Sequence, residues 1–209
     1  MIRCTFPDIL GQKQLKITKV SEDTKISRPT LTALYYNNSK GIQFETLDKL
    51  CKYLKITHKD FFEFLPVDIS LDIKSAELNK DMNGPEEDSI YIDIDASFIH
   101  FDQNNYKTVI DLTGLCWARE SIVSPEEASE RAFKYDYGVC TVGIKETKDV
   151  ETLCNIFSSL SLGFKNYVEN LIQEAITLKV QEKGVTKLAS LKFVYDMTYE
   201  EYNMKFPKE

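Results

Sequence analysis

The 209-residue sequence predicts an all-α N-terminal domain of five helices, followed by an α+β domain with a largely antiparallel sheet. Changes in hydrophobic pattern support this division. Up to about residue 65, apolar residues recur every three to four positions, the period of an amphipathic helix. In several segments between residues 67 and 117 apolar and polar residues alternate, as in half-buried strands, and after residue 149 the helical period returns.

The N-terminal domain is organised around residues 17–36, ITKVSEDTKISRPTLTALYY, which predict two short helices joined by a tight turn. Ser27 suits the N-cap of the second helix, and Pro29 lies in its first turn, where a missing N–H costs nothing. Small Ser21 stands where the two helices must touch. The residues expected to face inward are Val20, Thr24, Ile26, Leu31 and Leu34. This is a helix-turn-helix layout, in which the second helix enters the DNA major groove.

The run ISRPTLTALYYNNSKGIQFETLDKLCKYLKIT also resembles the Cro/C1-type (XRE-like) helix-turn-helix regulators. In that family ISR-x-T-L-x-x-L opens the recognition helix, and TL-x-x-L-C-x-x-L forms the next core helix. The resemblance covers about residues 3–65 and implies sequence-specific DNA binding, usually with repression of transcription. The sequence departs from the family at Lys25, in the turn where a glycine most often adopts positive φ without strain.

Caps and periodicity predict the remaining helices of this domain. Thr5 can cap a first helix that extends to about Lys13. The segment ETLDKLCKYL places Leu47, Leu50, Cys51 and Leu54 on one helix face. Thr57 can cap a fifth short helix, HKDFFEFL, and Pro66 then ends the domain.

The rest of the chain predicts strands first and helices later. Residues 67–73 predict a strand, and polar residues 74–89 predict a surface loop or linker. Residues 90–101 and 106–117 predict a hairpin with its turn at DQNN. Further elements are expected as a helix from Ser124, a strand over 138–144, helices between Asp149 and Glu182, a strand at LASLKFVY, and a terminal helix capped by Thr198 and Glu201.

We therefore divide the chain into a DNA-binding domain at 1–65, a strand and linker at 66–89, and an α+β dimerisation or sensing domain at 90–209. The amphipathic run from Gly163 to Glu182 leaves two alternatives open. Its apolar stripe forms an interface between two copies, or it is buried in the core of the domain.

Charge is divided unevenly along the chain. Residues 1–65 carry 11 Lys and Arg against 7 Asp and Glu, a net charge of +4, whereas residues 66–209 carry −11. This division suits a protein that presents one domain to phosphates and keeps the rest away from the duplex. No segment approaches the roughly 18 consecutive apolar residues of a membrane span, so we expect a soluble cytoplasmic protein.

The five cysteines include no C-x-x-C pair, and the chain has only two histidines. This pattern favours reduced, buried thiols over a zinc site or a disulfide framework. Asp93, Asp95, His100 and Asp102 could together hold a divalent metal, but the strand period places Asp93 and Asp95 on a polar sheet face that needs no chemistry. We expect no metal, no cofactor and no enzymatic activity. The Ala-Gly bond of self-cleaving lambda-type repressors is missing, as are the P-loop, H-E-x-x-H and G-x-S-x-G motifs.

Residues in the N-terminal half of the recognition helix are expected to contact bases. They are Arg28, Pro29, Thr32 and Ala33. Arg28 can pair bidentately with guanine, and Thr32 and Ala33 can offer methyl groups to thymine. The expected DNA-backbone contacts are Thr18, Lys19, Ser27, Tyr36, Asn38, Ser39 and Lys40. The alternative for Arg28 and Lys40 is an ordinary solvated charge.

Together these features favour a DNA-binding transcription regulator, a dimeric repressor of phage or mobile-element type whose partner is an operator in double-stranded DNA. Two recognition helices about 34 Å apart would read a roughly palindromic operator. The C-terminal domain would dimerise or receive a signal from an effector or an antirepressor. The alternative hypothesis is an antitoxin or immunity-type interaction protein with autoregulatory DNA binding.

Overall fold

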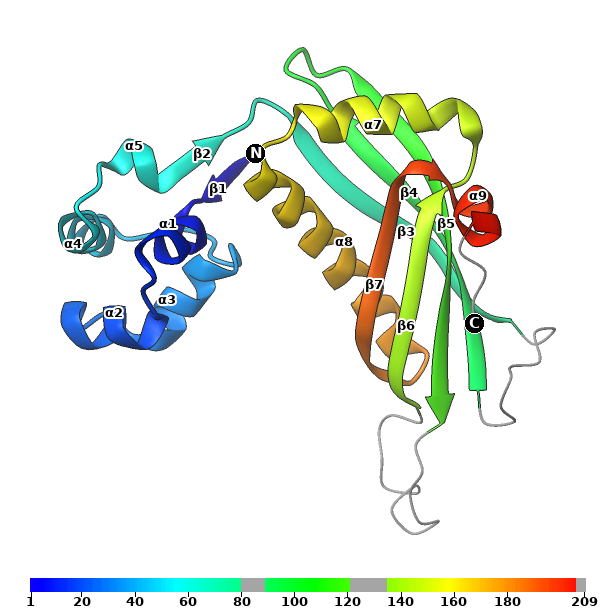
Figure 1. Cartoon of the computed structure of the whole chain (residues 1–209), viewed down its shortest axis with the longest axis horizontal. Coiled ribbons are helices and arrows are strands. Elements are labelled where there is room, and N and C mark those ends of the chain that lie inside the picture. Colours follow the sequence, from blue (N-terminus) through cyan, green and yellow to red (C-terminus); the bar gives the residue numbers. More distant parts are fainter. Residues whose placement is uncertain (80–88, 121–134, 206–209) are drawn as a thin grey trace, which may run out of the picture. The chain divides into compact units, whose positions relative to one another are not determined.

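The computed structural model describes residues 1–79, 89–120 and 135–205, which form two compact units (Figure 1). The first unit contains residues 1–68 together with 162–167. The second contains the rest of the described chain, from residue 69 to 161 and from 168 onward. Each unit has its own buried core.

The first unit consists of short helices and one small sheet. Its elements are β1 (Ile2–Cys4), α1 (Phe6–Lys13), α2 (Ile17–Thr24), α3 (Arg28–Tyr35), α4 (Phe44–Leu54), α5 (His58–Phe61) and β2 (Phe62–Phe64). The prediction that this part of the chain is entirely helical is wrong, because β1 and β2 pair antiparallel, with Ile2 opposite Phe64. The segment HKDFFEFL therefore leaves the helix after Phe61. Its aromatic residues suit a strand, and β1 supplies the partner.

Aromatic and aliphatic side chains from the helices fill the core of the first unit. Phe6 of α1 and Phe61 of α5 are both fully buried, with their ring centroids 6.0 Å apart. Val20, Leu31 and Leu50 are also fully buried. These residues bring the ends of the domain sequence together, so that the helices close around a single core.

Two predicted caps have different outcomes in this unit. Thr57 and Asp60 form the two reciprocal bonds of a capping box at the start of α5. Thr5 occupies the N-cap position of α1, but its hydroxyl donates to the carbonyl oxygen of Asp60 at 2.5 Å instead of capping the helix. Thr5 thus fastens the start of α1 to α5.

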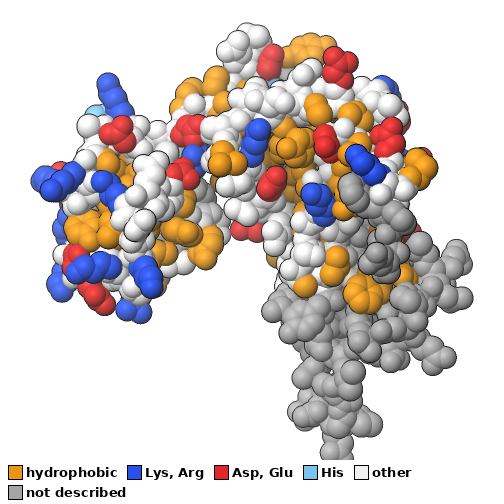
Figure 2. Space-filling model, in the orientation of Figure 1, with side chains coloured by type: hydrophobic (Ala, Val, Ile, Leu, Met, Phe, Trp, Pro, Cys, Tyr) orange, Lys and Arg blue, Asp and Glu red, His pale blue; other side chains and the backbone are white. Residues whose placement is uncertain are grey.

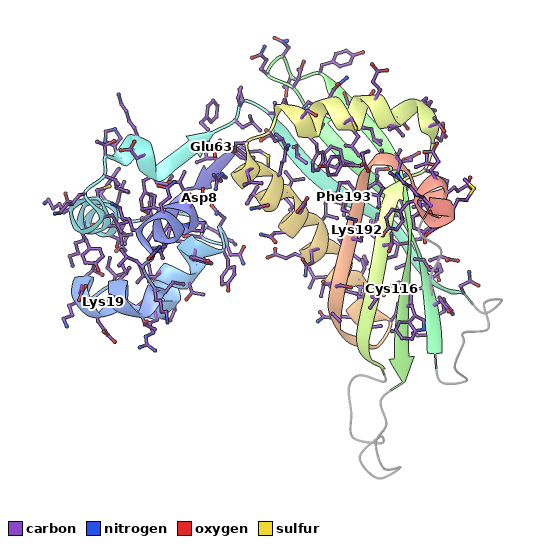
Figure 3. All side chains as sticks on the ribbon, viewed as in Figure 1. Asp8, Lys19, Glu63, Cys116, Lys192 and Phe193 are labelled. Carbon is purple, nitrogen blue, oxygen red and sulfur yellow. The ribbon has the colours of Figure 1, made fainter. Side chains whose placement is uncertain are left out.

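Arg3 of β1 is the one buried cation among the described residues, with a side chain 6% exposed. Its Nε donates to Glu63 at 2.7 Å, and a terminal nitrogen donates to Asp8 at 2.6 Å; both carboxylates are labelled in Figure 3. The guanidinium also lies 5.6 Å from the ring centroid of Phe164. A Cβ on Gly163 would meet the Arg3 guanidinium, so a larger residue there would displace the Arg3 side chain. The paired carboxylates compensate its burial.

The second unit is built on a five-stranded sheet of order β3-β4-β5-β6-β7. Its strands are β3 (Asp68–Asn79), β4 (Ser89–Phe101), β5 (Lys107–Glu120), β6 (Tyr135–Ile144) and β7 (Val185–Thr198). The β4–β5 and β5–β6 pairs are antiparallel, whereas β6 and β7 run parallel, so the sheet is mixed. The connection between β6 and β7 contains α7 (Val150–Ser159) and α8 (Leu162–Glu182).

Strand β3 extends further than its hydrophobic pattern predicts. Residues 74–79, expected in a surface loop, continue the strand to Asn79. In a sheet, the backbone N–H and C=O groups of these residues can bond to a neighbouring strand instead of to water. The helix predicted from Ser124 lies outside the described residues. The terminal helix α9 (Tyr199–Lys205) begins as predicted, since Thr198 and Glu201 form a capping box.

Alternating residues of the sheet and one stripe of α8 form the core of the second unit. Ile92, Ile94 and Phe98 of β4 are buried, and Phe157 of α7 lies 6.0 Å from Phe98 between ring centroids. The fully buried residues of α8 in this unit are Val168, Ile172, Ile176 and Val180. Core burial therefore accounts for these four residues of the amphipathic run, whereas Leu178 is 64% exposed.

The five cysteines are free, and Cys4, Cys116 and Cys140 are buried. Within the described ranges, the helices are all too short or too polar to cross a membrane.

We predict that Phe98→Ala destabilises the second unit by about 3–5 kcal/mol, because truncation leaves a cavity in a tightly packed core. Trp117 in β5 is the only tryptophan of the chain, so its fluorescence during urea unfolding follows this unit. Tyr106→Ala is the control, since Tyr106 is 74% exposed and its loss should change stability by less than about 0.5 kcal/mol. Equal losses of unfolding free energy in the two variants would contradict the assignment of Phe98 to the core.

The Cys4 thiol makes stability depend on alkaline pH. Burial raises the pKa of Cys4 to about 11, whereas the pKa of an unfolded thiol is about 8.5. The contribution of the protonated Cys4 thiol to the free energy of unfolding is therefore complete below a pH of about 8.5. It is lost as the pH rises towards 11, by at most about 1.4 kcal/mol per pH unit. We expect Cys4→Ala to unfold with a shallower pH dependence in this range, as followed by circular dichroism. Identical slopes for the two proteins would refute this prediction.

Candidate nucleic-acid interface

The turn between α2 and α3 is held by side-chain bonds to the backbone. Ser21 Oγ donates to the carbonyl oxygen of Ile26 at 2.7 Å, and the Ile26 N–H donates to Thr24 Oγ1 at 3.3 Å. Lys25 ends α2 with φ of 60°, and its N–H donates to the Ser21 carbonyl at 2.9 Å. Lys25 thus adopts the left-handed conformation that glycine would adopt without steric cost.

The first turn of α3 is capped as the sequence predicts. Ser27 has extended backbone angles, and its Oγ accepts a hydrogen bond from the Thr30 N–H at 3.3 Å. The Ser27 and Thr30 hydroxyls also lie 2.7 Å apart. Pro29 occupies the first turn, where its lack of an N–H leaves no bond unmade. The cap and Pro29 therefore both favour a helix that begins directly after Ser27.

The helical period divides α3 into a buried and an exposed side. Leu31 and Leu34 are 0% and 3% exposed and lie in the core of the unit. Arg28, Pro29 and Thr32 are exposed, and the predicted base contact Ala33 is half-buried beside them. Residues four apart lie above one another on a helix, so Arg28 and Thr32 share a row, as do Pro29 and Ala33. The structure thus brings the four predicted base-contact residues to one side of α3.

The residues predicted for DNA-backbone contacts precede and follow this part of α3 in the chain, and all are exposed: Thr18 and Lys19 in the first turn of α2, Ser27 at the cap, and Tyr36, Asn38, Ser39 and Lys40 after α3. Two of their polar groups are already engaged within the unit. The Ser27 hydroxyl is the cap, and Ser39 Oγ donates to the Gly41 carbonyl at 2.5 Å. Their hydroxyls therefore hold local structure in the free protein.

Lys19, labelled in Figure 3, is part of a small polar network on α2. Its ammonium lies 2.9 Å from the Asp23 carboxylate, which also accepts a hydrogen bond from the Tyr53 hydroxyl at 2.7 Å. The bonds from Lys19 and Tyr53 lower the pKa of Asp23. Asp23 remains ionised and directs the Lys19 side chain, whose ammonium has further N–H groups for a phosphate.

Positive charge predominates around the turn. The exposed cations of residues 16–40 are Lys16, Lys19, Lys25, Arg28 and Lys40, against the two carboxylates of Glu22 and Asp23. Figure 2 shows Lys and Arg side chains at several places over the visible face of this unit. Arg28 has no ion-pair partner among the residues that the structure describes. Such a surface attracts a polyanion, and Arg28 is available to it.

A capped second helix, a tight left-handed turn and an exposed helix side with Arg28, Pro29 and Thr32 make up a helix-turn-helix. Residues 6–66 match the family model of the Cro/C1-type HTH DNA-binding domain. The match confirms the family resemblance and its N-terminal location, and it supports a DNA-binding transcription regulator. No curated protein and no solved structure matches the chain at the significance that we required.

Asn37 is absent from the site residues that the sequence predicts. It follows α3 with φ of 57°, and its side chain bonds to the backbone of Cys4 in β1. An asparagine directly after a helix favours the left-handed conformation, which is a local signal. Its partner could not be found in this way, because β1 is itself not predicted.

The structure does not gather the acidic residues of β4 and the following turn into a metal site. Asp93 accepts a hydrogen bond from Asn79, Asp95 pairs with Lys145 at 3.4 Å, and Asp102 accepts bonds from two N–H groups of its own turn. Burial lowers the pKa of His100. Over the described parts of the chain, no three His, Cys, Asp or Glu side chains are placed to hold one ion.

We predict that Lys25→Gly stabilises the first unit by about 0.5–1 kcal/mol, because glycine relieves the left-handed strain while gaining some freedom in the unfolded chain. Lys25→Ala removes the same charge and keeps the strain, so it should bring no such gain. Urea unfolding followed by far-ultraviolet circular dichroism measures both variants. A gain of equal size in Lys25→Ala would show that charge, and not backbone strain, is the cause.

Proposed function

We propose that this chain is a transcriptional repressor that binds an operator in double-stranded DNA as a homodimer. The observation that carries the proposal is the side of α3 that presents exposed Arg28, Pro29 and Thr32 with half-buried Ala33 beside them, in a domain that matches the Cro/C1-type HTH DNA-binding domain. The cationic surroundings of the turn add the affinity for phosphates that every DNA-binding protein needs.

Each residue has a distinct task in this proposal. Arg28 donates bidentately to guanine, which discriminates against other bases by about 1–3 kcal/mol. Thr32 and Ala33 present methyl groups to thymine, and Pro29 contacts the groove without a donor of its own. The phosphate contacts come from α2, the cap and the loop after α3, and they set the position of α3 without reading sequence.

A dimer follows from the small number of bases that one helix can reach. Two copies of α3 about 34 Å apart would read two half-sites on one face of the duplex. We assign dimerisation, and the reception of a signal from an effector or an antirepressor, to the second unit. The net charge of −11 over residues 66–209 supports this division, since such a domain is repelled by the duplex. The proposal contains no catalytic step.

The first test is DNA selection by the full-length protein from a library of random duplexes, followed by titration at several salt concentrations. We predict that Arg28→Ala weakens binding to the selected duplex by about 1–3 kcal/mol and relaxes preference at one position of each half-site. Lys59→Ala is the matched control, because Lys59 is an exposed cation of α5, outside the helix-turn-helix. It should leave the preference unchanged.

Sedimentation of the protein with the selected duplex measures how many copies bind. Two copies on a duplex with two half-sites support the dimer. Weak binding that is equal on all sequences would overturn the proposal and favour the interaction-protein hypothesis, as would an Arg28→Ala variant that keeps the affinity and preference of the wild type.

A further inference from the structure

One side chain fastens the C-terminal end of α3 to β1. Asn37 Oδ1 accepts a hydrogen bond from the Cys4 N–H, and Asn37 Nδ2 donates to the Cys4 carbonyl oxygen at 3.1 Å. A single amide thus pairs with both backbone polar groups of one strand residue. The two residues are 33 positions apart in the sequence, so the contact belongs to the tertiary structure of the unit.

The Cys4 backbone groups are available because β1 has a partner strand on only one side. The Thr5 N–H donates to the Phe61 carbonyl at 3.0 Å, and the Leu65 N–H donates to the Met1 carbonyl at 3.0 Å. In an antiparallel pair the polar groups of alternate residues point to opposite sides, so those of Cys4 point away from β2. The Asn37 amide therefore satisfies the open edge of β1 at this residue.

The same residue also ends the recognition helix. The Asn37 N–H donates to the Leu34 carbonyl at 3.3 Å, and the Asn38 N–H donates to the Ala33 carbonyl at 2.9 Å. These are the two bonds of a Schellman motif, with asparagine where glycine is commonest. We call the two hydrogen bonds between the Asn37 amide and the Cys4 backbone the clamp. Because Asn37 provides both the helix end and the clamp, α3 cannot move relative to β1 without breaking one of them.

We propose that Asn37 is a positioning residue for DNA recognition, which orients α3 so that Arg28 and Thr32 meet base edges in register. This inference rests on the proposed function. Asn37 is half-buried, and both ends of its amide are bonded within the unit, so it acts through α3. Base contacts depend on geometry, whereas attraction to phosphates depends mainly on charge. Loss of the clamp should therefore reduce specific binding and spare non-specific binding.

The test is Asn37→Gly in the full-length chain. Glycine adopts a φ of 57° without strain, so the substitution removes the amide and keeps the turn. Gln14→Gly is the matched control, because Gln14 is an exposed residue with φ of 54° at the end of α1. The probes are a duplex selected by the wild type from a random library and an unselected random-sequence duplex. Binding is measured by fluorescence anisotropy at a temperature where circular dichroism shows all three proteins folded.

We expect Asn37→Gly to bind the selected duplex about ten-fold more weakly, the factor expected for one impaired base contact, with unchanged affinity and salt dependence on the random duplex. Gln14→Gly should bind both duplexes like the wild type. A folded Asn37→Gly protein that keeps wild-type affinity for the selected duplex would overturn the inference, as would an equal loss on both duplexes.

Should Asn37→Gly fail to fold, Asn37→Asp provides the same test. It keeps an acceptor for the Cys4 N–H but loses the donor and places a carboxylate beside the Cys4 carbonyl. The same loss confined to the selected duplex is expected, and wild-type selectivity in this variant would refute the inference. Failure of the proposed function is distinguishable, because the wild type would then select no sequence.

Discussion

The two-sided character of α3 is the constraint on which the candidate interface depends. Leu31 and Leu34 must be buried for the first unit to have a core, and the 3.6-residue period then determines which residues remain outside. Arg28 and Thr32 are exposed for this reason, and not because of any contact that they make. The same helical period therefore both buries the core residues and exposes the candidate interface.

The local features of this surface could be predicted from the sequence. The Ser27 cap, the position of Pro29 and the left-handed turn at Lys25 each depend on residues within a few positions of one another. Steric limits and capping bonds act at that range, so residue type and spacing are sufficient. The hairpin of β4 and β5 is similar, since its strands alternate clearly and are joined by a short turn.

Features that depend on distant partners could not be predicted in the same way. Strands β1 and β2 have three residues each, too few for a period, and their pairing joins residues about 60 positions apart. Without β1, the Asn37 amide has no predictable partner, and the Thr5 bond to Asp60 likewise joins residues 55 positions apart. The parallel pairing of β6 and β7 likewise requires the long connection through α7 and α8, and periodicity does not specify which strand edge the chain returns to.

The surroundings of Arg28 differ from those of two cations in the sheet. In the sheet, Lys74 pairs with Asp111 at 2.6 Å and Lys145 with Asp95 at 3.4 Å, so these cations are neutralised where they stand. In the helix-turn-helix, Lys19 pairs with Asp23 at 2.9 Å, but Arg28 has no such partner among the described residues. An exposed cation without an ion-pair partner retains its full attraction for an anion from outside the chain. Under the proposed function, the unpaired charge of Arg28 favours contact between α3 and the duplex.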